Sequence, residues 1–103
     1  GNHASSHSSA SDRRLKKNVH PYTDALDFLN KIEPVQYEWK DKERGDRPYK
    51  GFIAQDVEKV FSKWVIEEDG IKKIAIPPLE LESIIIKSIQ ELYEMIEEIK
   101  DNK

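Results

Sequence analysis

The residues of this chain best suited to chemistry are a serine and a lysine five positions apart, Ser11 and Lys16, in the basic run SDRRLKKN. A serine hydroxyl is a poor nucleophile near neutral pH and needs an adjacent base to take its proton. A lysine amine serves as that base where burial or nearby cations keep part of it neutral. Arg13, Arg14 and Lys17 would disfavour a further positive charge at Lys16. The pair is therefore a candidate nucleophile and base, although the spacing alone is equally typical of a solvated basic stretch.

Other chemistries find little support in the sequence. The chain contains no cysteine, which removes disulfides and thiolate catalysis. Its three histidines, His3, His7 and His20, lack the regular spacing of metal ligands, so we expect no metal site and no cofactor. The run RRLKK is suited to phosphate contacts, but the net charge of -3 and the lack of a recognition helix argue against a nucleic-acid partner.

The composition describes one small domain. With 103 residues, of which 37% are hydrophobic and 36% charged, the chain has a limited core. A domain of this size buries only roughly 60 to 65% of the surface that its unfolded form exposes, so an isolated monomer should be marginally stable. The longest apolar run is far shorter than the ~18 residues of a membrane span, and we expect no membrane partner.

The first ten residues differ sharply from the rest of the chain. Residues 1–10 (GNHASSHSSA) are rich in serine and poor in apolar side chains, which is typical of a linker or leader. The basic run begins immediately afterwards, so we place a boundary between Ala10 and Ser11, with one domain over 11–103. Met95 is the sole methionine, and we therefore expect the chain to be a fragment of a longer protein.

The apolar patterns downstream predict short elements of both kinds. Thr23 is a candidate N-cap for an amphipathic helix that must end before Pro34. Alternating apolar and polar residues predict half-buried strands, and Asp69-Gly70 supplies the positive φ angles of a tight hairpin turn. The predicted elements are strands over 35–40 and 49–54, a short helix over 55–61, and a hairpin of 64–66 with 71–76.

The C-terminal segment predicts a long helix over 79–101, which follows the stop signal Pro77-Pro78 and contains no glycine or proline. Isoleucine at both core positions of a heptad favours three or four helices over two, and we expect a trimer. The alternative is a helix that packs only on its own domain. The fold class is therefore α+β, with short antiparallel strands and helices and a long C-terminal helix that forms a trimeric coiled coil. The predicted trimer seam is Ile85, Ile89, Leu92, Ile96 and Ile99.

Four segments in a fixed order carry a resemblance to a known family: SDRRLKKN at 11–18, YEWK at 37–40, GFIAQDVEKV at 51–60 and SIQELYEMIEEIK at 88–100. Together they resemble the intramolecular chaperone, or tailspike endopeptidase, domain of phage endosialidases, tail fibres and neck appendages. Self-cleaving membrane-bound transcription factors of the myelin regulatory factor type share that domain. The resemblance covers about residues 11 to 100.

The resemblance implies a function. Such domains assemble as homotrimers, template the folding of the tail spike or fibre upstream in the same polypeptide, and release themselves by cutting before the motif serine. Here that bond is Ala10-Ser11, with Ser11 as nucleophile and Lys16 as general base. The implied location is the host cytoplasm during phage assembly, with the parent protein in the virion tail or an appendage. The further motif residues that the resemblance implies are Asp12, Arg14 and Asn18.

The position of Ser11 constrains the chemistry of such a cut. Its Oγ can reach the Ala10 carbonyl carbon through a five-membered ring, shifting the acyl group from nitrogen to oxygen, and water can hydrolyse the resulting ester. Connectivity itself supplies the proximity of the reacting groups. Two alternatives stay open: a trimerisation module without enzymatic activity, and a small DNA-binding or regulatory domain that uses RRLKK.

Overall fold

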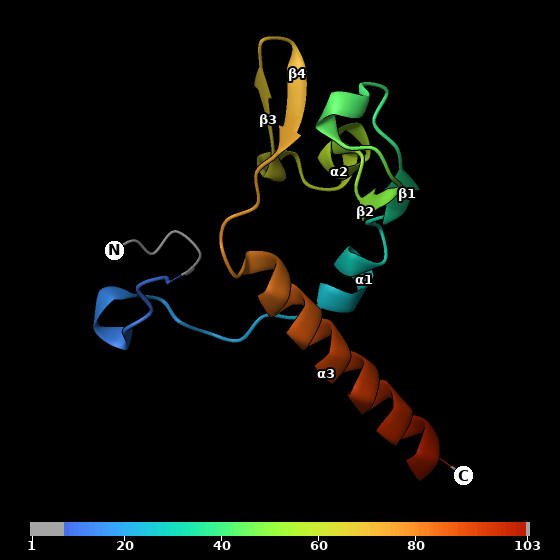
Figure 1. Cartoon of the computed structure of the whole chain (residues 1–103). Helices are drawn as coiled ribbons and strands as arrows, with labels where there is room; N and C mark the ends of the chain where they lie inside the picture. The colour runs from blue at the N-terminus through green and yellow to red at the C-terminus, as the bar shows by residue number, and fades with distance from the viewer. Residues whose placement is uncertain (1–7, 103) are drawn as a thin grey trace.

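The computed structural model describes residues 8–102, and the fold is α+β (Figure 1). Residues 1–7, most of the predicted leader, lie outside the described residues, as do His3 and His7. The described chain consists of an exposed N-terminal arm, a small body of short elements, and one long helix. The elements are η1 (Arg13–Leu15), α1 (Ala25–Leu29), β1 (Val35–Tyr37), η2 (Lys42–Arg44), β2 (Tyr49–Gly51), α2 (Ala54–Val60), η3 (Ser62–Trp64), β3 (Val65–Glu68), β4 (Ile71–Ile74) and α3 (Glu80–Asp101).

The start of α1 corrects one sequence prediction. Thr23 does not cap this helix, because its Oγ1 donates instead to the Asp24 carboxylate at 3.4 Å. Asp24 directly precedes the helix in a left-handed conformation, with φ of 65°, and its own side chain makes no capping bond. The N–H groups at this end are satisfied instead by a side chain of α3. The helix is also short, ending at Leu29 well before Pro34.

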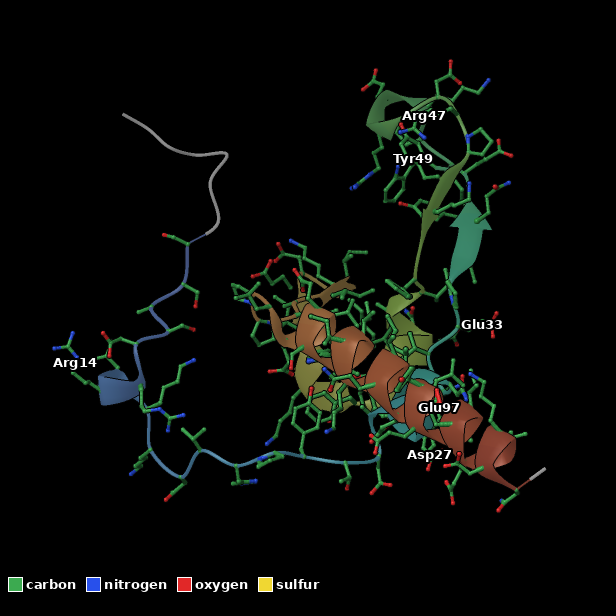
Figure 2. All side chains as sticks on the ribbon, turned by 90° about the horizontal axis from the view of Figure 1, so that it is seen from below. Arg14, Asp27, Glu33, Arg47, Tyr49 and Glu97 are labelled. Carbon is green, nitrogen blue, oxygen red and sulfur yellow. The ribbon has the colours of Figure 1, made fainter. Side chains whose placement is uncertain are left out.

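The first two strands form an antiparallel pair, β1 with β2, in which Val35 opposes Gly51 and Tyr37 opposes Tyr49. Both strands are shorter than predicted. The second cannot extend to residue 54, because the carbonyl of Ile53 already accepts the N–H groups of the first turn of α2. The loop between the strands contains η2. At the end of this loop the Arg47 guanidinium lies 3.9 Å from the ring centroid of Tyr49, the first residue of β2 (Figure 2).

The second hairpin pairs β3 with β4 and confirms the predicted turn. Asp69 has a φ of 53° and Gly70 a φ of 77°. Positive φ at both central residues is what a two-residue hairpin turn of this kind requires. The paired residues run from Val65 opposite Ile74 to Glu68 opposite Ile71. The predicted strand over 71–76 therefore ends two residues early, where the chain turns toward α3.

The core is small and aromatic. Trp64 is 1% exposed, and its ring meets those of Phe28 and Phe61 edge to face, with centroids 5.4 and 5.5 Å away. Such edge-to-face pairs stabilise a fold beyond the area that they bury. The Trp64 indole Nε1–H also donates to the Glu80 carboxylate at 2.6 Å, which ties this core to the first residue of α3.

The long helix α3 runs from Glu80 to Asp101, one residue inside the predicted start, and Leu79 takes the position before it with a left-handed φ of 69°. The helix α3 packs against α1, and Ser88 on α3 is buried. The five predicted seam residues are all exposed in the single chain. Beyond α1, the C-terminal half of the helix extends away from the body (Figure 1).

Candidate functional site

Ser11 and Lys16 are hydrogen-bonded to each other, with Lys16 Nζ donating to Ser11 Oγ at 2.8 Å. A tight turn between them closes this contact. The N–H of Leu15 donates to the Asp12 carbonyl at 2.9 Å, and that of Lys16 to the Arg13 carbonyl at 3.1 Å, forming η1. The spacing of five residues thus brings the two side chains together by local structure alone.

Asp12 and Arg14 hold this turn. The Asp12 carboxylate caps η1 by accepting the Arg14 backbone N–H at 2.9 Å, and it also accepts the Arg14 guanidinium at 3.1 and 2.8 Å. These hydrogen bonds from Arg14 lower the pKa of Asp12, and they raise the pKa of Arg14 in turn. The Arg14 charge is therefore paired with Asp12. This changes the role expected from the sequence, in which Arg14 acts on Lys16 as a free cation.

Asn18 lies in the left-handed region with φ of 54°. Asparagine tolerates this conformation better than most residues, since its short polar side chain can bond locally. The backbone therefore changes direction two residues after Lys16, between the turn and the extended stretch that leads to α1. Asn18 thus shapes the path of the chain next to the pair.

The pair sits on an arm, defined here as residues 8–24, in which every residue is exposed. Within the described chain, two hydrogen bonds join this arm to α3. The Tyr22 hydroxyl meets the Ser83 hydroxyl at 2.7 Å, and the Asp24 N–H donates to the Glu91 carboxylate at 2.9 Å. Sequence reasoning missed both contacts, because they join residues 61 and 67 positions apart with no local pattern to announce them.

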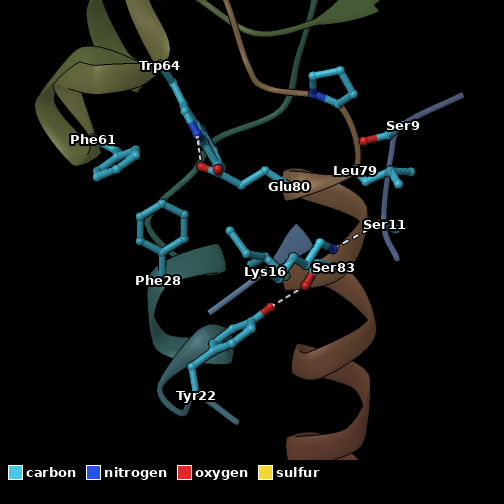
Figure 3. A pocket seen from close by; sticks show the side chains of 12 residues that line it. Ser9, Ser11, Lys16, Tyr22, Phe28, Phe61, Trp64, Leu79, Glu80 and Ser83 are labelled. Carbon is cyan, nitrogen blue, oxygen red and sulfur yellow. Dashed lines mark hydrogen bonds between the residues drawn. The ribbon is translucent and has the colours of Figure 1, made fainter. Parts of the chain in front are cut away.

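Ser11 and Lys16 stand at the edge of a groove of about 440 Å³ between the arm and the body (Figure 3). Its apolar wall includes the three rings of the core, and its other side follows the start of α3. Ser9 also lines the groove, whereas Ala10 does not. None of the five seam residues lines it either. The full lining is Ser9, Ser11, Lys16, Tyr22, Phe28, Phe61, Trp64, Pro78, Leu79, Glu80, Ser83 and Ile84.

This arrangement suits proton transfer between an amine and a hydroxyl in contact with solvent. The separation of 2.8 Å between Nζ and Oγ is within the reach that a general base needs. Because both side chains are exposed, water has direct access to any product formed on the serine. Among residues 8–102 there is no group of histidines and carboxylates that could hold a metal ion, and no helix long and apolar enough to cross a membrane.

A comparison with family models matches residues 11–66 to the chaperone of endosialidase, a family classed among the peptidases. The match covers more than half of the chain. The chain belongs to the chaperone of endosialidase family. The family match begins at Ser11 and ends within β3, so it contains the Ser11–Lys16 turn, the arm beyond it and most of the body.

One relative of this chaperone chain is the long tail fibre protein Gp37 of Salmonella phage S16, which is 34% identical over 106 residues. The alignment takes in 89% of the chain but 14% of the tail fibre protein. The chain therefore corresponds to a small part of this relative. Because the alignment takes in 89% of the chain, it must include residues beyond 66, where the family match ends.

Proposed function

We propose that this chain is an intramolecular chaperone that trimerises, assists the folding of a phage tail spike or fibre, and then releases itself by cutting the Ala10-Ser11 bond. Ser11 is the nucleophile and Lys16 the general base. The observation that carries this proposal is the hydrogen bond of 2.8 Å between Lys16 Nζ and Ser11 Oγ in a chain of this family. The family match that begins at Ser11 supports a domain boundary at the same bond.

The proposed cleavage proceeds in two steps, an acyl shift from nitrogen to oxygen and hydrolysis of the resulting ester. The neutral amine of Lys16 takes the Ser11 hydroxyl proton as Oγ attacks the Ala10 carbonyl carbon. The C–N bond then breaks, and the Ser11 nitrogen leaves as an amine with the proton returned from Lys16. Water next attacks the ester, Oγ recovers a proton, and the products are an Ala10 carboxylate and a chain that begins with Ser11. Because nucleophile and carbonyl belong to adjacent residues, little translational entropy is lost in the first step.

Two global measures of the chain support its association with partner chains. Its accessible surface is 9112 Å². A typical folded monomer of this mass exposes only about 6000 Å². The radius of gyration of the chain is 17.9 Å. A compact domain of this length has a radius of gyration of about 13 Å, so a single chain leaves much surface to be covered by partners.

The exposed side of α3 supplies a surface for those partners. Its five seam residues are between 39% and 62% exposed, although all are isoleucine or leucine. They recur at alternate steps of four and three, the spacing that places side chains on one line of a coiled coil. Ile86 and Tyr93 widen the same apolar face and are also exposed. We propose a parallel three-stranded coiled coil along this seam.

The relative supports the proposal that a tail fibre is the protein whose folding this chain assists. It is a long tail fibre protein, and this chain corresponds to 14% of it. We propose that a fibre of this kind precedes residue 11 in the same polypeptide and that the released fibre resides in the virion tail. Assembly would take place in the host cell before the virion is complete.

A second candidate function is a trimerisation module that does not cut. The exposed seam of α3 serves this function equally well, and the complete exposure of Ser11 and Lys16 leaves the site without the water-excluding walls of many peptidases. The two candidates differ in whether the bond before Ser11 breaks once trimers form.

The deciding experiment is intact mass spectrometry of this chain with a longer native leader, in the unaltered form and as Ser11→Ala and Lys16→Ala. Lys17→Ala is the matched control, since it removes the neighbouring exposed lysine and leaves the hydrogen-bonded one. We expect a fragment beginning at Ser11 from the unaltered and Lys17→Ala proteins only. If all four remain whole while sedimentation finds trimers, the cutting function is refuted and the trimerisation module remains.

A further inference from the structure

The position of the Ser11–Lys16 turn relative to the body is not fixed by the turn itself. The contacts inside the turn are made among residues 11–16, and no described hydrogen bond joins those residues to the body. Residues 17–21 are likewise exposed, and their described hydrogen bond is local, between His20 Nδ1 and the Pro21 carbonyl. The location of the pair at the groove therefore depends on where the arm is anchored.

The first anchor is the hydroxyl pair of Tyr22 and Ser83, 2.7 Å apart. Both residues line the same groove as Ser11 and Lys16 (Figure 3). Pro21 immediately precedes Tyr22, and its ring restricts the backbone next to the anchor. A small displacement of Tyr22 would therefore also displace the Ser11–Lys16 turn, because residues 17–21, which connect the two, include this restricted proline.

The second anchor is the Glu91 carboxylate, which accepts the Asp24 N–H at 2.9 Å and the Leu26 N–H at 2.8 Å. Ser83 and Glu91 are eight residues apart on α3, about 12 Å along its axis. Ser83 lies roughly 120° around the helix from the seam residue Ile89, at about 100° per residue. The anchors and the seam therefore occupy different sides of α3, so both can be engaged at once.

We propose that Ser83, Tyr22 and Glu91 are positioning residues that register the catalytic arm on α3, so that loss of these contacts slows cleavage. This inference rests on the proposed self-cleavage and adds the residues that position its site. None of the three residues needs to touch the reacting atoms for this effect.

The test is a double-mutant cycle on the first anchor, with Tyr22→Phe, Ser83→Ala and the double variant in the chain with its longer leader. Tyr22→Phe keeps the ring and removes the hydroxyl. Tyr49→Phe and Ser62→Ala are matched controls, because they make the same chemical changes at positions outside the arm that do not line the groove. The first-order rate of appearance of the Ser11 fragment is measured by mass spectrometry, at protomer concentrations where sedimentation finds the same assembly for every variant.

We expect each single variant to cut about 10- to 100-fold more slowly, the cost typical of a misplaced reacting group. The double variant should be no slower than the worse single variant, because both remove the same contact. Ser83→Thr, which keeps a hydroxyl, should restore most of the rate. Rates that match the controls, or losses that simply add in the double variant, would overturn the inference.

Amide hydrogen exchange over residues 11–24 gives a second readout that does not require cleavage. We expect faster exchange there in Tyr22→Phe than in Tyr49→Phe, and equal exchange would also overturn the inference. If no form of the chain is cut, the proposed self-cleavage fails. The anchoring of the arm is then decided by exchange alone, so the two failures remain distinguishable.

Discussion

The carboxylate of Glu91 on α3 accepts the backbone N–H of Leu26 on α1 at 2.8 Å, across 65 residues of sequence. Its other oxygen accepts the Asp24 N–H, so one side chain satisfies two N–H groups at the start of α1. The first turn of a helix leaves such groups without partners, and a residue just before the helix usually supplies the acceptor. Here the acceptor comes from the packed helix, which explains why neither Thr23 nor Asp24 caps α1.

Removing this cap should loosen α1 from α3. We expect Glu91→Ala to lower the free energy of unfolding by about 1 to 3 kcal/mol, the range for a lost charged hydrogen-bond partner. Glu91→Gln should lose less, because an amide oxygen still accepts one N–H. Urea unfolding at a fixed protomer concentration measures this, with the exposed Glu94→Ala as control. Equal midpoints for Glu91→Ala and Glu94→Ala would contradict the capping role.

The hydrogen bond between Trp64 and Glu80 predicts a similar difference between alanine and glutamine substitutions in the core. Glu80→Ala leaves the buried indole N–H without its acceptor, which should cost about 1 to 3 kcal/mol of stability. Glu80→Gln should retain most of it, since its amide oxygen accepts in the same place. The midpoint of thermal unfolding, followed by far-ultraviolet circular dichroism, distinguishes the two. Glu82→Ala removes an exposed carboxylate from the same first turn of α3 and should leave that midpoint unchanged.

Ser88 predicts a substitution that improves the fold. It is 2% exposed on α3, and its hydroxyl has no hydrogen-bond partner within the described structure. Alanine removes that unsatisfied group and has the higher helix propensity, so Ser88→Ala should raise stability by about 0.5 to 1.5 kcal/mol. Ser88→Leu should instead destabilise the protein, because a larger side chain at a position that is 2% exposed would overpack its surroundings. A lower urea midpoint for Ser88→Ala would mean that the hydroxyl has a partner after all.

The seam makes a separate prediction about assembly. Ile89→Asp places a charge in the centre of the proposed coiled coil, where it would be costly to bury, and should shift the chain from trimer to monomer in sedimentation equilibrium. Gln90→Asp introduces the same carboxylate one residue away and off the seam, and should leave the trimer intact. Trimers of Ile89→Asp as stable as those of the unaltered chain would place the interface elsewhere.

The capped turn at the site should respond to acid. Hydrogen bonds from Arg14 lower the pKa of Asp12 in the folded chain. The stability that this carboxylate gives the turn is therefore fully present above its ordinary pKa of about 3.9. It is lost as the pH falls through the lowered value, when protonation breaks the pair with Arg14. We expect the chemical shifts of the Asp12 and Arg14 amides to change together in acid, below about pH 4. In Asp12→Asn this change of chemical shift in acid should be absent.

The sequence allowed parts of this fold to be predicted where one segment decides its own structure. The helix that became α3 was placed to within one residue, because a continuous run of helix formers follows Pro77-Pro78. The hairpin turn at Asp69-Gly70 was also local, since two residues tolerant of positive φ suffice. Ser11 and Lys16 differ, because their spacing alone is equally typical of a solvated basic stretch and the family resemblance singled them out, although a short turn joins them in the structure.

The missed features all depend on distant partners. Nothing near Thr23 signals that Glu91 will cap α1, and nothing near Tyr22 indicates Ser83. The length of the second strand likewise depended on a competing use of the Ile53 carbonyl. Such contacts follow from packing one element on another, which periodicity within a single segment does not determine.

The turn from Asp12 to Lys16 has one further consequence. Because hydrogen bonds among neighbouring residues close it without any buried side chain, its formation requires no cooperative core. Heating should therefore weaken the Ser11–Lys16 contact gradually, like the melting of a short peptide, while the aromatic core around Trp64 is lost in one sharp transition. Two thermal curves recorded on the same chain, one from each region, should not superimpose.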